Sequence, residues 1–320
     1  MMKNEAGVRI EEMLCQLADA TRIDGEIWRA AYTLEDKIAK NILREWIEDL
    51  GLEYREDAIG NVYGRLPGTE PGTILTGSHL DTVKNGGKYD GALGVVTGVA
   101  ALGYLKQSGF VPKHSLEVGG LMEEEGSRFP SGCQGSRAIC GTLKEEDLEE
   151  LSRDGVTLRE ALVSAGYRTE VLKNVKRDDI RAIVELHIEQ GADLEERGLT
   201  CGAVTAIVGY DRLFLTLHGE ANHAGTTSMR RRRDALAAAA EVILGVKELA
   251  EADDRFVATV GQLNVAPNAV NIVPGKVQLA IETRAADDRV LAEVRAKIVS
   301  LLERTASKSG VVITKENDFH

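Results

Sequence analysis

The sequence has 320 residues, and its 51 acidic residues outnumber its 39 basic ones to give a formal net charge of −12. This charge argues against a protein that binds nucleic acid or an anionic membrane, because a basic surface supplies most of that affinity. A hydrophobic content of 43% argues against disorder. We find no apolar run of about 18 residues and no secretory signal, and we therefore expect a cytoplasmic protein without a membrane span.

Strands and helices alternate through the first two-thirds of the chain. Apolar residues at helical spacing predict two helices within residues 11–50 and another over residues 91–107. Residues 145–172 are predicted to be helical with a break at Gly155. Mostly apolar runs predict strands at residues 60–66, 73–77, 115–122 and 180–187. This alternation predicts an α/β domain with a largely parallel sheet over residues 1–209.

The pattern changes after Gly209. The predicted elements that follow are a strand at 213–217, a helix at 234–251, strands at 256–264 and 277–284, a helix at 287–307 and a strand at 310–315. This β-α-β-β-α-β order is that of the ferredoxin-like split unit. We therefore expect residues 210–320 to form a second, α+β domain, and a prior of roughly 150 residues per domain also predicts two domains.

Side chains that can bind a metal ion follow three strands of the predicted first domain. They are His79, Asp90, Glu123, Glu124, Glu125 and His187. Sites in open α/β sheets form at the carboxyl ends of the strands, so we expect these groups to meet. Imidazole nitrogens with carboxylate oxygens suit Zn²⁺ or Mn²⁺, and one Asp carboxylate can bridge two metals, as in paired-metal hydrolases.

Each of these residues also has an ordinary structural interpretation when it is considered alone. A single His after a strand is most often a surface or core residue, and a run of Glu is most often a solvated loop. Asp90 could cap the helix that follows Gly91. Three such groups at the same end of three consecutive strands are hard to explain by chance, and their combination favours a metal site.

Five motifs, taken in order, resemble those of one enzyme family. They are Gly77-Ser-His79-Leu-Asp81-Thr-Val83, Tyr89-Asp90-Gly91, Glu123-Glu124-Glu125-Gly-Ser-Arg-Phe-Pro130, Glu185-Leu-His187-Ile-Glu-Gln-Gly191 and His223-Ala-Gly-Thr-Thr227. From Asn61 to Arg284 the chain resembles the N-carbamoyl-L-amino acid hydrolase and allantoate amidohydrolase family of the dinuclear-metal aminoacylase and carboxypeptidase superfamily. The resemblance implies a metallopeptidase-like catalytic domain with an inserted ferredoxin-like domain that acts as lid and dimerisation domain.

The resemblance also implies a set of metal ligands. His79 and His187 would bind one divalent metal, Asp90 would bridge, and Glu125 would bind a second metal. The metals would be Zn²⁺ or Mn²⁺, with Co²⁺ and Ni²⁺ as further options. Family members continue beyond the lid to a Gly-His-Asp motif whose His completes the second site. The present sequence ends at the last predicted lid strand, so we expect its second site to be incomplete.

Two further residues of these motifs take catalytic roles by resemblance. Glu124 would be the general base for water activated at the metal site, and Asp81 would hydrogen-bond His79 and fix its tautomer. Because three Glu stand in a row, Glu123 and Glu124 remain an alternative base and ligand pair.

The expected lid carries residues that would hold the substrate. His223 would stabilise the oxyanion from the lid of a partner subunit in a homodimer, while Asn271 and Arg284 would hold the substrate carboxylate. Gln190 is a weaker candidate for the same task. The implied reaction releases ammonia and CO₂ from an N-carbamoyl-L-amino acid.

The substrate and the activity of this chain leave alternatives open. Tyr210 stands where allantoate-type members tend to carry Gln, which favours N-carbamoyl amino acids, with allantoate or another ureido acid as the alternative. A truncated form that binds a ligand without catalysis is the alternative from another class.

Overall fold

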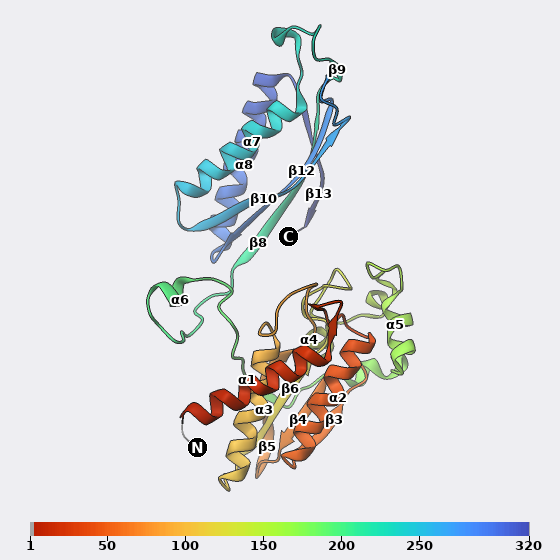
Figure 1. Cartoon of the computed structure of the whole chain (residues 1–320), viewed down its shortest axis with the longest axis vertical. Coiled ribbons are helices and arrows are strands. Elements are labelled where there is room, and N and C mark those ends of the chain that lie inside the picture. Colours follow the sequence, from red (N-terminus) through yellow and green to blue (C-terminus); the bar gives the residue numbers. More distant parts are fainter. Residues whose placement is uncertain (1–2, 320) are drawn as a thin grey trace. The chain divides into compact units, whose positions relative to one another are not determined.

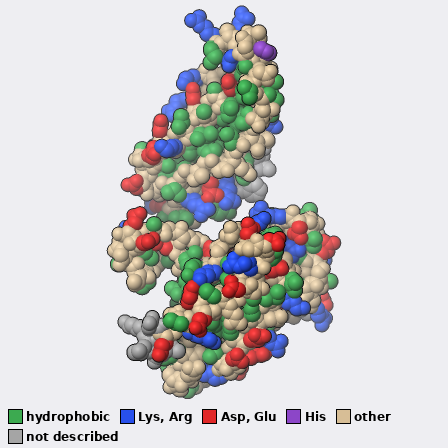
Figure 2. Space-filling view, in the orientation of Figure 1, with side chains coloured by type: hydrophobic (Ala, Val, Ile, Leu, Met, Phe, Trp, Pro, Cys, Tyr) green, Lys and Arg blue, Asp and Glu red, His purple; other side chains and the backbone are tan. Residues whose placement is uncertain are grey.

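The computed structural model describes residues 3–319, and the chain divides after Arg197 into two compact units (Figure 1). This division lies upstream of the predicted domain boundary at residues 209 and 210. No helix among the described residues has the length and apolar character needed to cross a bilayer. On the face drawn in Figure 2, acidic and basic side chains of the first unit are interspersed and form no continuous basic surface.

The first unit combines helices with a five-stranded sheet. Its helices are α1 (Lys3–Ala20), α2 (Leu34–Asp49), α3 (Ala92–Gln107), α4 (Gln134–Cys140), α5 (Leu158–Ala165) and α6 (Asp193–Glu196), with 3₁₀ helices η1 (Glu145–Glu149) and η2 (Thr169–Asn174). Its strands are β1 (Arg22–Ile23), β2 (Glu26–Ile27), β3 (Glu53–Glu56), β4 (Val62–Leu66), β5 (Glu70–His79), β6 (His114–Leu121) and β7 (Ile180–Val184).

The main sheet has the strand order β3-β4-β6-β5-β7 and is mixed. The central β5 pairs in parallel with β6 and β7, whereas β4 runs antiparallel to both β3 and β6. The α/β class is therefore confirmed, but the largely parallel sheet needs correction. Short loops join β3 to β4 and β4 to β5, so the chain reverses at both ends of β4, whereas parallel neighbours need a long crossover.

Helices α2 and α3 cover one face of this sheet, and α1 packs against both of them (Figure 1). Leu14 and Leu17 of α1 and Leu43 and Ile47 of α2 are buried in this core, at the helical spacing that predicted both elements. The Thr33 hydroxyl caps α2 by accepting a hydrogen bond from the backbone of the first turn. The helices fix the sheet from one side, and the loops at the ends of β5, β6 and β7 carry the candidate site.

The segment predicted as one broken helix over residues 145–172 instead forms η1, α5 and η2. A capping box between Thr157 and Glu160 starts α5, and Gly166 ends it in a left-handed conformation. Gly155 has a φ of +82°, so the predicted break is present. The caps therefore divide a segment whose apolar spacing alone suggested longer helices.

The second unit is a four-stranded antiparallel sheet with two helices. Its elements are β8 (Gly209–His218), β9 (Asn222–His223), η3 (Met229–Arg231), α7 (Ala235–Glu251), β10 (Phe256–Ala266), β11 (Ile272–Val273), β12 (Lys276–Ala285), α8 (Asp288–Ser309) and β13 (Val312–Phe319). The strand order is β10-β12-β8-β13, and α7 and α8 pack on one face over a separate apolar core. The predicted ferredoxin-like order is confirmed, with β9 and β11 as an additional small sheet.

Candidate metal centre

The predicted metal-binding residues of the first unit lie at one edge of the main sheet. His79 is the last residue of β5, the Glu run follows β6, and His187 follows β7. Because β5 pairs in parallel with β6 and β7, the carboxyl ends of all three strands meet at this edge. The topology therefore brings together residues that are separated in the sequence.

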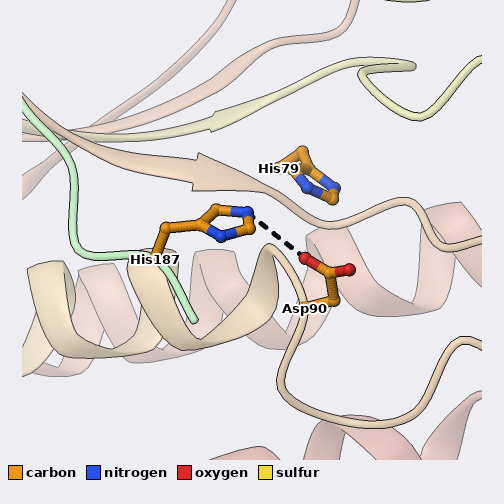
Figure 3. Close-up of side chains that lie close together, drawn as sticks. All are labelled: His79, Asp90 and His187. Carbon is orange, nitrogen blue, oxygen red and sulfur yellow. Dashed lines mark ion pairs between the residues drawn. The ribbon is translucent and has the colours of Figure 1, made fainter. Parts of the chain in front are cut away.

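Three side chains form a cluster with the spacing of metal ligands (Figure 3). His79, Asp90 and His187 each offer one ligand atom, and these atoms lie within 4.8 Å of one another. Two imidazole nitrogens and one carboxylate oxygen are the donors that Zn²⁺ and related divalent ions prefer. The donor set therefore fits a divalent metal ion.

The two histidines are oriented by backbone carbonyl groups. Nδ1 of His79 lies 2.9 Å from the carbonyl oxygen of Asp81, and Nδ1 of His187 lies 2.8 Å from that of Ile188. A carbonyl oxygen only accepts, so each Nδ1 atom carries a proton, and in the neutral imidazole each Nε2 atom is the one with a lone pair. Both imidazoles thus have the tautomer that a metal ligand requires.

Asp90 supplies independent support for a cation at this place. Its Oδ1 lies 3.2 Å from Nε2 of His187, yet this buried oxygen has no hydrogen-bond partner among the described residues. A carboxylate oxygen this close to an imidazole nitrogen is stabilised by a cation, either a proton on the imidazole or a metal ion that both atoms bind. Gln190, a candidate for holding the substrate carboxylate, instead donates a 2.9 Å hydrogen bond to Oδ2 of Asp90.

Asp81 holds the loop that follows β6. Its Oδ1 and Oδ2 accept 3.1 Å hydrogen bonds from the backbone N–H groups of Glu124 and Glu125. Its Oδ1 is 3.6 Å from Nδ1 of His79, so the carbonyl group of Asp81 makes the closer contact with that ring. Burial raises the pKa of the Asp81 carboxyl. The bonds from Asp81 to this loop had no signal in the sequence.

The three consecutive glutamates occupy different environments. Glu123 is fully buried, and its Oε1 accepts hydrogen bonds from the backbone N–H groups of Arg128 and Phe129. Burial raises the pKa of Glu123 to about 7. Oε2 of Glu124 instead lies 3.5 Å from Nε2 of His79. This geometry favours Glu124, and not Glu123, as the carboxylate that works beside the metal ligands.

Electrostatics link the remaining glutamate to the cluster. Burial raises the pKa of Glu125, the charge of His79 opposes this shift, and the carboxylate of Asp90 adds to it. The pKa of His79 is also raised, because Asp81 and Glu124 outweigh the opposite effect of burial. Within the described residues Glu125 lies outside the three-residue cluster, so its role as a second-metal ligand stays a prediction.

The candidate lid residues all lie in the second unit. His223 of β9 pairs with Ile272 of β11, and the N–H of Ala224 donates to the carbonyl of Asn271, so His223 and Asn271 are neighbours on an exposed surface. Arg284 lies near the far end of β12, roughly 25 Å away at about 3.3 Å per residue. Its Nε donates a 2.7 Å hydrogen bond to Glu282.

A buried arginine beside the site was missed in the sequence. Arg29 is only 1% exposed, and its Nε donates a 2.6 Å hydrogen bond to the carbonyl of Leu80, between His79 and Asp81. Burial lowers its pKa to about 10. An Arg in a short segment is ordinarily a surface residue, and only the apolar residues on both sides of Arg29 hinted at its burial.

Comparison with known proteins gives consistent matches. Residues 75–317 match the model of peptidase family M20/M25/M40. The chain is 43% identical to an allantoate amidohydrolase of Bacillus subtilis, over 90% of this chain and 71% of that protein. It is 40% identical to an N-carbamoyl-L-amino acid amidohydrolase of Geobacillus stearothermophilus, over 97% of this chain and 77% of that protein.

Solved structures agree with these matches. A hydantoinase/carbamoylase family amidase from Burkholderia multivorans superposes with a TM-score of 0.88 at 33% sequence identity. The similarity covers 98% of this chain and 77% of that one.

Proposed function

The chain belongs to peptidase family M20/M25/M40 and is a hydrolase of linear C–N amide bonds, and we propose that it cleaves the ureido group of N-carbamoyl-L-amino acids. The observation that carries this proposal is the cluster of His79, Asp90 and His187 with Glu124 beside it. The cluster supplies the ligand atoms for a divalent metal ion, and Glu124 supplies a carboxylate next to one of these ligands, His79.

The proposed chemistry is hydrolysis of a ureido group. A divalent metal held by His79, Asp90 and His187 would polarise the substrate carbonyl and lower the pKa of water. Glu124 takes a proton from the attacking water and delivers it to the leaving nitrogen. Its side chain is about half exposed, which leaves it open to water and substrate. Ammonia leaves, and the remaining carbamate decomposes to CO₂ and the amino acid.

The metal content is part of the proposal. We expect Zn²⁺ or Mn²⁺ at the cluster, with Co²⁺ and Ni²⁺ as substitutes. A second divalent ion would share Asp90 as a bridging ligand and use Glu125. Asp81 follows β5 and accepts hydrogen bonds from the backbone N–H groups of Glu124 and Glu125. These two hydrogen bonds hold the loop, and with it both carboxylates, near the cluster.

The second unit is proposed to bind the substrate and to form a homodimer. His223 would donate to the developing oxyanion from the partner subunit, and Asn271 beside it would bind the substrate carboxylate. Arg284 lies at the other end of β12 and is proposed to grip a carboxylate from there. A cytoplasmic location remains the prediction for the whole protein.

Allantoate is the second candidate substrate, because the chain is 43% identical to an allantoate amidohydrolase and 40% identical to a carbamoylase. Ammonia release should be measured with N-carbamoyl-L-methionine and with allantoate after loading with Mn²⁺ or Zn²⁺. We expect kcat/KM to be at least about 10-fold higher for N-carbamoyl-L-methionine, which is about 1.4 kcal/mol of transition-state discrimination. A preference for allantoate would replace the first substrate by the second, and no ammonia from either would contradict the proposal.

A further inference from the structure

The loop between β6 and α4 carries Glu124 and Glu125 and has no regular secondary structure. Glu123 begins this loop with a φ of +46°, a conformation uncommon for a residue with a long side chain. Its side chain turns into the protein and is 0% exposed. The loop therefore needs specific bonds to hold its path.

Two buried carboxylates satisfy the backbone of this loop from different sides. Asp81 accepts the N–H groups of Glu124 and Glu125 at 3.1 Å each. Oε1 of Glu123 accepts the N–H groups of Arg128 at 2.9 Å and of Phe129 at 2.7 Å. The carboxylate of Asp81 therefore holds the start of the loop, and the carboxylate of Glu123 holds the backbone of residues 128 and 129 farther along it.

Backbone bonds at the base of the loop complete this arrangement. The carbonyl of Glu124 accepts from the N–H of Cys133 at 3.1 Å, and that of Glu123 accepts from the N–H of Gln134, also at 3.1 Å. The backbone of Glu124 is therefore fixed at both its N–H and its carbonyl group. Without the hydrogen bonds to Glu123, two backbone N–H groups of the loop lose their acceptor. Unpaired buried N–H groups are costly, so we expect the loop conformation to change.

We propose that Glu123 is a positioning residue whose side-chain oxygen fixes this loop so that Glu124 and Glu125 face the cluster of His79, Asp90 and His187. The inference rests on the proposed function, because it concerns the geometry of the same site. Glu123 acts through its neighbours, since both bonds of its Oε1 are made to backbone groups. The position of the loop should therefore depend on the length of the side chain that carries the acceptor oxygen, and not on its negative charge.

Two conservative variants separate reach from charge. Glu123→Gln keeps an oxygen at the same distance and loses the charge, whereas Glu123→Asp keeps the charge and shortens the reach by one methylene. We expect Glu123→Gln to keep kcat within about twofold of the parent, and Glu123→Asp to lower it about 100-fold with KM changed less than threefold, as a displacement near 1 Å produces. Glu150→Gln is the matched control, because it removes a charge beside the same loop and keeps an acceptor oxygen for the N–H group of Ser131.

Cobalt binding gives a readout that does not depend on turnover. The visible absorption of bound Co²⁺ should be unchanged in Glu123→Gln and Glu150→Gln and altered in Glu123→Asp, with thermal unfolding of the metal-free proteins recorded alongside. If Glu123→Gln is as inactive as Glu124→Gln, the charge is required and the proposal is overturned. The proposal is equally overturned if Glu123→Asp matches the parent in both kcat and spectrum. If no variant shows turnover but the cobalt spectra separate as expected, the proposed substrate fails while the positioning role stands.

Discussion

Asp90 lies just before α3, and its side chain lies beside those of His79, the last residue of β5, and His187, which follows β7. One of its oxygens lies beside Nε2 of His187 without a hydrogen bond, and the other accepts from Gln190. As an isolated residue it could equally have been a helix cap, but α3 has Gly91 at its N-cap position with no side-chain cap bond. The structure thus places Asp90 in the cluster.

Asp90→Asn tests this assignment. The amide preserves the shape but removes the anionic donor, so we expect the affinity for Zn²⁺ to fall by more than about 100-fold, because even residues that only orient ligands cost about 10–100-fold. Isothermal titration of the metal-free protein measures the effect, with Glu150→Gln as a surface control. Unchanged zinc affinity in Asp90→Asn would remove Asp90 from the ligand set.

Asp81→Asn probes the link between the strand ends of β5 and β6. Asn offers one acceptor oxygen and one NH₂ group, so one of the two loop N–H groups loses its partner in a buried place. We expect a loss of about 1–3 kcal/mol in the free energy of unfolding, measured by urea titration without metal. A variant as stable as the parent would mean that water replaces the lost bond.

The kinds of residue at the site were predictable, but several of their contacts were not. His79, Asp90 and His187 were recognisable because strand ends in a parallel arrangement meet at one edge. The roles of Asp81 and Glu123 depend on backbone N–H groups of a loop whose path no sequence pattern specifies. Glu123 and Glu124 are identical in the sequence, and only the left-handed turn at Glu123 sends one inward and the next toward His79.

At the scale of elements, β7 has unusual surroundings for a parallel strand. Among the strands that the structure describes, β7 pairs only with β5 at the edge of the sheet, and its adjacent residues Ile183 and Val184 are 64% and 61% exposed. Neighbouring residues of a strand point to opposite faces, so both faces are open here, whereas parallel strands are ordinarily covered on both. Exposed apolar edge strands promote self-association.

Ile183→Lys should therefore reduce association of this 320-residue chain. We expect a lower weight-average mass by light scattering at high protein concentration, with a free energy of unfolding within about 0.5 kcal/mol of the parent. Val118→Lys, in the buried centre of β6, is the contrasting variant and should unfold the first unit. Equal association of Ile183→Lys and parent would show that β7 does not drive it.

The accuracy of the element predictions follows from physical causes. Long amphipathic helices and apolar strands were found, since burial imposes their periodicity. The strand β3, with the sequence Glu-Tyr-Arg-Glu, was missed because it is short and mostly exposed. The short helix α4 begins after Cys133 in a left-handed conformation and has no side-chain cap, so it lacks the usual start signal.

At the scale of the whole molecule, the chain consists of two units with separate apolar cores. The clustered metal ligands all belong to the first unit, and both tryptophans of the sequence, Trp28 and Trp46, lie there too. Tryptophan fluorescence therefore reports unfolding of the first unit alone, while circular dichroism reports both.

Metal binding should stabilise one unit selectively. With Zn²⁺ at about 100 times its dissociation constant, we expect the free energy of unfolding of the first unit, measured by fluorescence, to rise by about 2.7 kcal/mol. The reason is that only the folded first unit binds the metal. A second transition, seen only by circular dichroism, should stay in place, and a chelator should reverse the first shift. Equal shifts of both transitions would contradict independent units.

The most direct test of the central claim, a metal-dependent hydrolase with Glu124 as its base, is a comparison of the parent with Glu124→Gln. Metal content is measured on both proteins, and ammonia release from N-carbamoyl-L-methionine is measured under the same conditions. We predict equal metal content and a kcat lower by about 10²–10⁴-fold in Glu124→Gln, the usual contribution of a general base. Undiminished ammonia release by Glu124→Gln with full metal content would contradict the account.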